Sequence, residues 1–205
     1  MWRFDSVFAY GFDQVFEQFL RYYPDLDERD ALYKACVESV RLDYNTIRSN
    51  AAAVGDWLEG KSEKDVLDAL AAAPEGASAA DVGPVIEAVA YVRHAGPFDW
   101  YYSRMFGIGL IQVMAKVGVD LSITNAEAWA DAMKMEKSKF AAEMGAYLSS
   151  MERLKQAEQI FAESTAREAK KTAERLAARA QAAAKEADQL EKEDELEVEA
   201  PTTSV

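Results

Sequence analysis

The side chains that could do chemistry in this chain are few and isolated. There is one histidine, His94, and one cysteine, Cys36, which is fewer than the usual structural zinc sites need. No Glu-x-x-His pair is present to hold a di-iron centre. Gly107 and Gly109 belong to a Gly-x-Gly-x-x-Gln string, which lacks the third glycine of a dinucleotide-binding loop. We therefore expect a protein that is not an enzyme and that has no cofactor and no metal.

Cys36 and His94 both have ordinary structural interpretations. Cys36 stands at helical spacing from Leu32 and Val40, which predicts a small buried hydrophobic side chain rather than a reactive thiol. His94 precedes Gly96 at the expected end of a helix, where a cationic side chain suits the helix dipole. A Cys36–His94 dyad is the alternative, and no other feature of the sequence supports it.

Charge is unevenly distributed along the 205 residues, whose formal net charge is −13. Residues 1–133 carry 21 acids and 11 bases, residues 134–185 carry 7 acids and 11 bases, and residues 186–205 carry 8 acids and one base. The acidic excess argues against a general nucleic-acid binder. An anionic partner, such as a membrane surface, would meet the basic 134–185 segment first.

No stretch of the sequence is long enough to cross a bilayer. The longest markedly apolar run without a charge, Met105 to Ala115, has eleven residues, whereas a spanning helix needs about 20. We expect no transmembrane segment, so contact with a membrane would be peripheral.

Helical periodicity is nearly continuous, which predicts an all-α multi-helix bundle with a long protruding C-terminal helix. The first helix, about 5–22, has an apolar face formed by residues spaced three and four apart: Phe4, Phe8, Phe12, Val15, Phe16, Phe19 and Tyr23. Further helices are expected at about 27–42, 45–58, 62–73, 85–93, 99–117, 126–134 and from 136, with a loop at 74–84. The helix at 99–117 is apolar on nearly all sides, so we expect it at the centre of the bundle.

Three regions are expected along the chain. Residues 1–134 would form the bundle, and residues 135–190 a long helix whose first half packs on the bundle through Tyr147, Met151, Leu154 and Phe161. From Ala162 an alanine-rich stripe repeats at four-three spacing, typical of a coiled coil. It is either a solvent-exposed single helix or a partner-binding arm. The acidic residues 191–205 are expected to be disordered.

Two ordered motifs resemble one known family. The first reads D-S-V-F-A-Y-G-F from Asp5 and continues with Tyr23-Pro24, an acidic turn, Arg29-Asp30, Tyr33 and Ala35. The second reads Y-S-R-M-F-G-I-G-L from Tyr102. Over about 5–163 the chain resembles the thylakoid-formation proteins, which are all-helical photosystem II biogenesis and repair factors of chloroplasts and cyanobacteria. The resemblance also implies that this chain lacks a helix that precedes the first motif in the family.

The resemblance implies a non-enzymatic auxiliary or scaffold protein that docks on the membrane-bound FtsH protease and so supports photosystem II biogenesis and repair. It implies the chloroplast stroma and the stromal face of the thylakoid, or the cyanobacterial cytoplasmic equivalent. A second hypothesis is a peripheral stromal-side subunit bound to a photosystem or antenna complex. A third, of another class, is a helical enzyme or carrier that holds a porphyrin or a lipid.

The candidate docking residues all lie in the two matched motifs or close to them. They are Asp5, Phe8, Gly11, Asp13, Tyr23, Arg29, Asp30, Tyr33, Tyr102, Ser103 and Arg104. The charged ones among them have two interpretations: they form intramolecular pairs that fix how the first, second and 99–117 helices cross, or they belong to a docking surface. The tyrosines near the first turn, at positions 22, 23 and 33, are either exposed interface residues or core.

Overall fold

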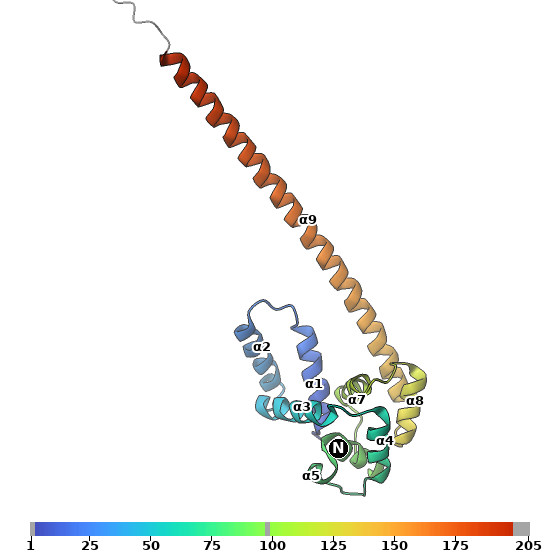
Figure 1. Cartoon of the computed structure of the whole chain (residues 1–205). Helices are drawn as coiled ribbons and strands as arrows, with labels where there is room; N and C mark the ends of the chain where they lie inside the picture. The colour runs from blue at the N-terminus through green and yellow to red at the C-terminus, as the bar shows by residue number, and fades with distance from the viewer. Residues whose placement is uncertain (1–2, 97–98, 199–205) are drawn as a thin grey trace, which may run out of the picture. The chain divides into compact units, whose positions relative to one another are not determined.

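The chain folds into helices alone within the residues that the structure describes, which are 3–96 and 99–198, with side chains described as far as 183. This computed structural model confirms the all-α prediction (Figure 1). The helices are α1 (Ser6–Phe19), α2 (Leu26–Ser39), α3 (Tyr44–Leu58), α4 (Glu63–Ala72), α5 (Ala79–Val82), α6 (Pro84–His94), α7 (Arg104–Lys116), α8 (Ile123–Ala132) and α9 (Lys137–Val198).

Side-chain caps set most of the helix starts. The Asp5 carboxylate accepts the Phe8 N–H at 2.7 Å at the start of α1. Ser62 and Asp65 form a capping box at the start of α4. Ser103 caps α7, which therefore begins at Arg104 and not at residue 99. Each cap satisfies an amide that has no partner inside the helix.

The helix α7 lies at the centre of the main core, as its apolar sequence predicts. Phe106, Leu110 and Ile111 of α7 are 0–1% exposed. α1 packs most extensively against α7 and α3. Phe140 and Met144, from the first turns of α9, are fully buried in the same core.

Two glycines allow the backbones of α1 and α7 to touch. A Cβ built on Gly11 would lie 2.0 Å from the Met105 carbonyl oxygen, and one built on Gly109 would lie 2.0 Å from the Val7 carbonyl oxygen. Neither contact can be relieved by rotating a side chain, because the neighbouring atoms are backbone. Gly11 belongs to the first sequence motif and Gly109 to the second, so the two motifs meet where α1 crosses α7.

Several local expectations need correction. Cys36 is exposed, not buried, because α2 buries only Tyr33 and Val37 against the bundle. The predicted loop at 74–84 contains the short helix α5, and Ser122 caps α8 so that it begins at residue 123. His94 lies in the last turn of α6, as expected.

A division between Ser150 and Met151 separates two units. Of the second unit, residues 162–183 are exposed along the whole helix, and the large side chains Ile160, Phe161 and Leu176 are 61–78% exposed. The helix continues to Val198 where the sequence analysis expects disorder, and residues 199–205 lie outside the described residues. Among the described helices, none combines the length and the apolar character needed to span a bilayer.

Candidate interaction surface

Five of the candidate docking residues are buried and therefore hold the bundle together. They are Asp5, Phe8, Gly11, Asp13 and Tyr33. Tyr23, Arg29, Tyr102 and Ser103 are partly exposed, and Asp30 and Arg104 are exposed. In this fold a partner could contact only the members of these last two groups.

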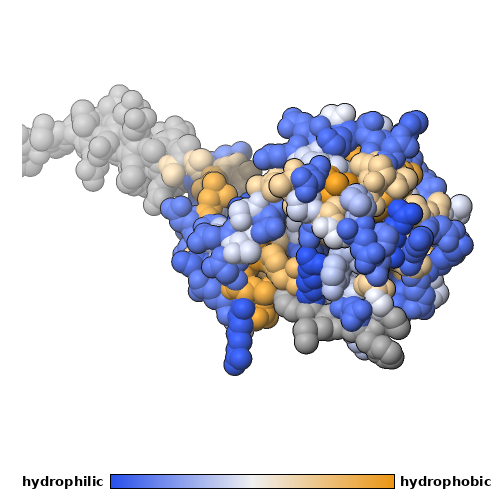
Figure 2. All heavy atoms as spheres, turned by 90° about the horizontal axis from the view of Figure 1, so that it is seen from below, coloured by the Kyte–Doolittle hydropathy of each residue, from blue (hydrophilic) through white to orange (hydrophobic). Residues whose placement is uncertain are grey.

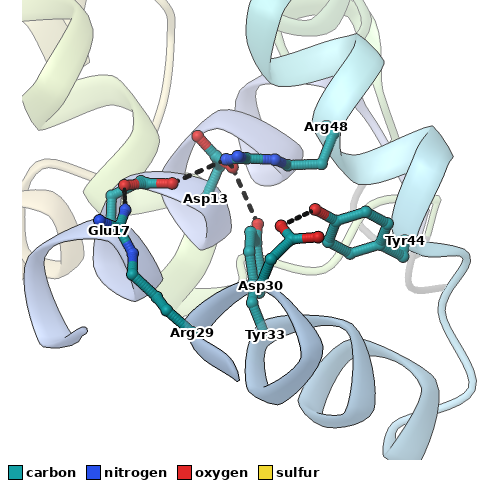
Figure 3. A network of polar contacts seen from close by, with 7 residues as sticks. All are labelled: Asp13, Glu17, Arg29, Asp30, Tyr33, Tyr44 and Arg48. Carbon is teal, nitrogen blue, oxygen red and sulfur yellow. Dashed lines mark hydrogen bonds and ion pairs between the residues drawn. The ribbon is translucent and has the colours of Figure 1, made fainter. Parts of the chain in front are cut away.

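A polar network joins α1, α2 and α3 (Figure 3). One guanidinium nitrogen of Arg48 lies 2.8 Å from the Asp13 carboxylate and 2.8 Å from the Glu17 carboxylate. Arg29 of α2 pairs with Glu17 from the other side. The two carboxylates are one helical turn apart on α1, so the network fixes the positions of α2 and α3 around that helix.

Two tyrosines complete this network. The Tyr33 hydroxyl donates to Asp13 at 2.9 Å, and the Tyr44 hydroxyl donates to Asp30. The Tyr33 ring stacks on Phe16 at a centroid distance of 4.9 Å. Burial, followed by the Asp13 charge, raises the pKa of the Tyr33 hydroxyl, so it remains a hydrogen-bond donor. Of the two interpretations of Tyr33, the structure shows the core one, since its side chain is 3% exposed.

The second motif makes its own contacts. Arg104 donates to Glu143 of α9 at 3.0 Å, and burial, followed by the Glu143 charge, raises the pKa of the Tyr102 hydroxyl. A Cβ on Gly107 would lie 2.0 Å from the Tyr102 hydroxyl oxygen. These contacts join α7 to the start of α9, inside the first unit.

Asp13, Arg29, Asp30 and Arg104 all make intramolecular contacts, which join α1, α2 and α3 to one another and α7 to α9. Their partners, Arg48, Glu17, Tyr44 and Glu143, were not identified from the sequence. The sequence contains one indication of this network. Glu17 follows Asp13 by four residues in α1, so the two carboxylates lie on the same face of the helix. No local pattern indicated Arg48, because its helix reaches α1 only through tertiary packing.

We expect the Asp13–Arg48 pair to contribute measurably to stability. Asp13 is buried whereas the Arg48 side chain is 40% exposed, so the coupling should lie between that of surface and buried pairs, at about 1–2 kcal/mol. A double-mutant cycle with Asp13→Asn and Arg48→Met, measured by urea unfolding, gives this coupling energy. Additive effects of the two substitutions would contradict the interaction.

Asp5 is a buried carboxyl group that caps a helix. Burial raises its pKa to about 6, and the Phe8 N–H and the nearby Arg3 oppose this rise. Between pH 3.8 and about 6 the folded chain holds a proton at Asp5 that the unfolded chain releases. The free energy of unfolding contributed by Asp5 is therefore largest below pH 3.8 and falls as the pH rises through about 6.

Replacing Asp5 with asparagine should stabilise the protein at neutral pH. Asparagine caps a helix about as well as aspartate, and it carries no charge to be desolvated. We expect a gain on the order of 2 kcal/mol at pH 7 that shrinks toward pH 4. Thermal unfolding of both proteins across this range tests it, since the other carboxyl groups cancel in the difference. Asp5→Ala, which removes the cap, should not show the gain.

The surface of the described part of the first unit includes the following two hollows. A pocket of about 220 Å³ lies beside the α1–α2 turn and is lined by Phe16, Glu17, Leu20, Leu26, Arg29, Asp30, Tyr33 and Arg48. A wider groove of about 890 Å³ has small residues of α3 among its lining, including Ala51, Ala52 and Gly55. Figure 2 shows hydrophobic patches set in a mostly hydrophilic face. Such features suit the docking of protein side chains.

Neither hollow is lined by Cys36 or His94. Within the described part of the chain, no group of three or more His, Cys, Asp and Glu side chains is placed to hold a metal ion. The charged side chains that converge in the first hollow already pair with one another.

Comparison with known proteins gives consistent matches. A sequence model described as thylakoid formation protein matches residues 1–176. The chain is 31% identical over 114 residues to Protein THYLAKOID FORMATION 1, chloroplastic, of Arabidopsis thaliana, covering 55% of this chain and 35% of that protein. It is 25% identical over 154 residues to Protein Thf1 of Synechococcus elongatus, covering 72% of this chain and 59% of that protein.

The alignment thus spans about a third of the length of the plant relative. A solved structure of Psb29 superposes with a TM-score of 0.66 at 19% identity, covering 84% of this chain and 79% of that one, which shows a common fold. The family match covers both motifs and the α1–α7 crossing at which they meet. The chain belongs to the thylakoid formation protein family.

Proposed function

We propose that this chain is a non-enzymatic auxiliary protein of thylakoid formation that supports photosystem II biogenesis and repair by docking on the FtsH protease complex. It would act at the stromal face of the thylakoid membrane, or at the cyanobacterial equivalent. The observation that carries the proposal is the family match over residues 1–176, which includes the bundle and much of the arm, residues 151–183.

A docking role is supported by the contrast between charges that are paired inside the bundle and side chains that are exposed on the arm. The buried or half-buried charges Asp13, Glu17 and Arg29 are paired within the bundle, whereas apolar and basic side chains of the arm are exposed. A protein that binds only the assembled form of a complex stabilises that form by mass action, and no chemical step is required.

Affinity capture from thylakoid extract tests the proposal. The tagged full-length chain should capture FtsH subunits, and a variant that lacks residues 162–205 should capture less if the arm makes the contact. Equal thermal midpoints for the full-length and the truncated protein would show that the bundle is folded in both. Capture of photosystem or antenna subunits at fixed stoichiometry, without the protease, would contradict FtsH docking and favour the peripheral-subunit hypothesis.

The carrier hypothesis has a separate test. The protein isolated from photosynthetic tissue should show only the absorbance of its tryptophans and tyrosines. A visible absorbance band that co-purifies with the chain, or a lipid found by mass spectrometry of the native protein, would contradict the docking proposal and favour the carrier.

A further inference from the structure

The exposed large apolar side chains of the described residues include two groups. The first is the hairpin tip, residues 19–26, where Phe19, Tyr22 and Leu26 are 80%, 67% and 71% exposed. The second lies on the arm, where Ile160 and Phe161 are 68% and 78% exposed. Exposed aromatic and aliphatic side chains in such density mark interaction sites.

The tip also provides a hollow beside Leu26. This pocket of about 220 Å³ is lined by the apolar side chains of Phe16, Leu20 and Leu26, and its other lining residues are Glu17, Arg29, Asp30, Tyr33 and Arg48. A cavity of about 150 Å³ holds benzene, so an aromatic ring fits this pocket by size. Its floor is rigid, because Phe16 stacks on Tyr33 and Tyr33 is bonded to Asp13.

The two groups have opposite charge around them. Residues 17–30 carry five acids and two bases, whereas residues 151–183 carry seven bases and five acids. The bases nearest in sequence to Phe161 are Lys155 and Arg167. The tip therefore favours a basic helix with an aromatic anchor, and the arm has that composition.

We propose that the hairpin tip of one copy binds the arm of a second copy around Ile160 and Phe161. Phe161 enters the pocket beside Leu26, and the arm bases face the acids at the start of α2. Each copy carries one tip and one arm, so a reciprocal exchange forms a symmetric dimer with two identical contacts.

Sedimentation velocity of the full-length chain over a concentration series tests this contact. The chain should dimerise, and Phe161→Ser should raise the dissociation constant about tenfold or more, as should Phe19→Ser combined with Leu26→Ser. Leu176→Ser on the arm and Val40→Ser directly after α2 are matched controls, because both are exposed apolar residues outside the contact. At concentrations at which the chain is monomeric, all variants should keep the same thermal midpoint, since every altered side chain is exposed.

Mixing the two disrupted proteins provides the decisive measurement. The Phe161→Ser chain retains an intact tip and the tip variant retains an intact arm, so the mixture should form heterodimers through one contact. Salt should weaken the association, because charges of opposite sign face each other. Each copy carries a net charge of −13, so salt also screens the repulsion between two whole chains. If the dimer became tighter as salt was added, this general repulsion would outweigh the tip–arm attraction, and the proposal would be overturned.

Three other results would also overturn it. The first is a chain that stays monomeric at every concentration. The second is a contact between tip and arm that is equally populated at all protein concentrations, because such a contact would form within one chain and not between two copies. The third is a dimer lost with Phe161→Ser but unchanged by the tip variant, which would indicate a coiled coil between two arms.

Discussion

Gly109→Ala should destabilise the bundle by about 3 kcal/mol or more, although alanine is the better helix former by about 1 kcal/mol. The new methyl group would lie 2.0 Å from the Val7 carbonyl oxygen. Relief requires α1 and α7 to move apart, which loosens the core around Leu110. Thermal and urea unfolding of the purified chain measure the loss.

Gly145→Ala and Gly55→Ala are the matched controls for this prediction. Both glycines lie within helices, and a Cβ at either position meets nothing within 4 Å. These substitutions should leave stability unchanged or raise it by up to about 1 kcal/mol. A Gly109→Ala protein as stable as these controls would show that the helices do not cross so closely.

Phe140→Ala should cost about 3–5 kcal/mol. Phe140 is fully buried in the main core and belongs to the first turn of α9. Its removal leaves a cavity where that helix packs on α7 and its neighbours. The urea midpoint should fall sharply, while much of the helical circular dichroism of the alanine-rich arm should persist, because alanine has high intrinsic helix propensity.

Phe161→Ala is the control, since the same residue type on the same helix is 78% exposed. We expect its effect on the stability of the isolated monomer to be within about 0.5 kcal/mol. Equal losses for the two phenylalanines would contradict the burial that distinguishes them.

The helices themselves could largely be predicted from the sequence. Apolar spacing and capping residues are local signals, so the existence of α1 to α4 and α6 to α9 follows from them, and Ser62 and Pro74 set the limits of α4. A prediction of burial from the sequence is wrong where a weak helical periodicity competes with tertiary packing. α2 has acceptable helical periodicity, yet it buries only Tyr33 and Val37, so Cys36 is exposed although its spacing predicts burial.

The candidate site was predicted in part. The two motifs contain residues on which packing depends, since Gly11 of the first and Gly109 of the second each lie against backbone atoms of the other helix. The exposed tip at Phe19 and Leu26 was not predicted, because an apolar residue at helical spacing is normally assigned to the core. In the last turn of α1, Phe16 stacks on Tyr33 of α2, whereas Phe19 is 80% exposed.

The sequence by itself determined the helical class, the order of the elements, the opposite charges of bundle and arm, and the family. These properties depend on composition and on neighbours in the chain. Only the tertiary structure decided that Asp13 meets Arg48, that the two motifs touch through Gly11 and Gly109, and that Phe16 is covered while Phe19 is exposed. Such contacts join residues far apart in the chain, and which of them form depends on how several helices share one core.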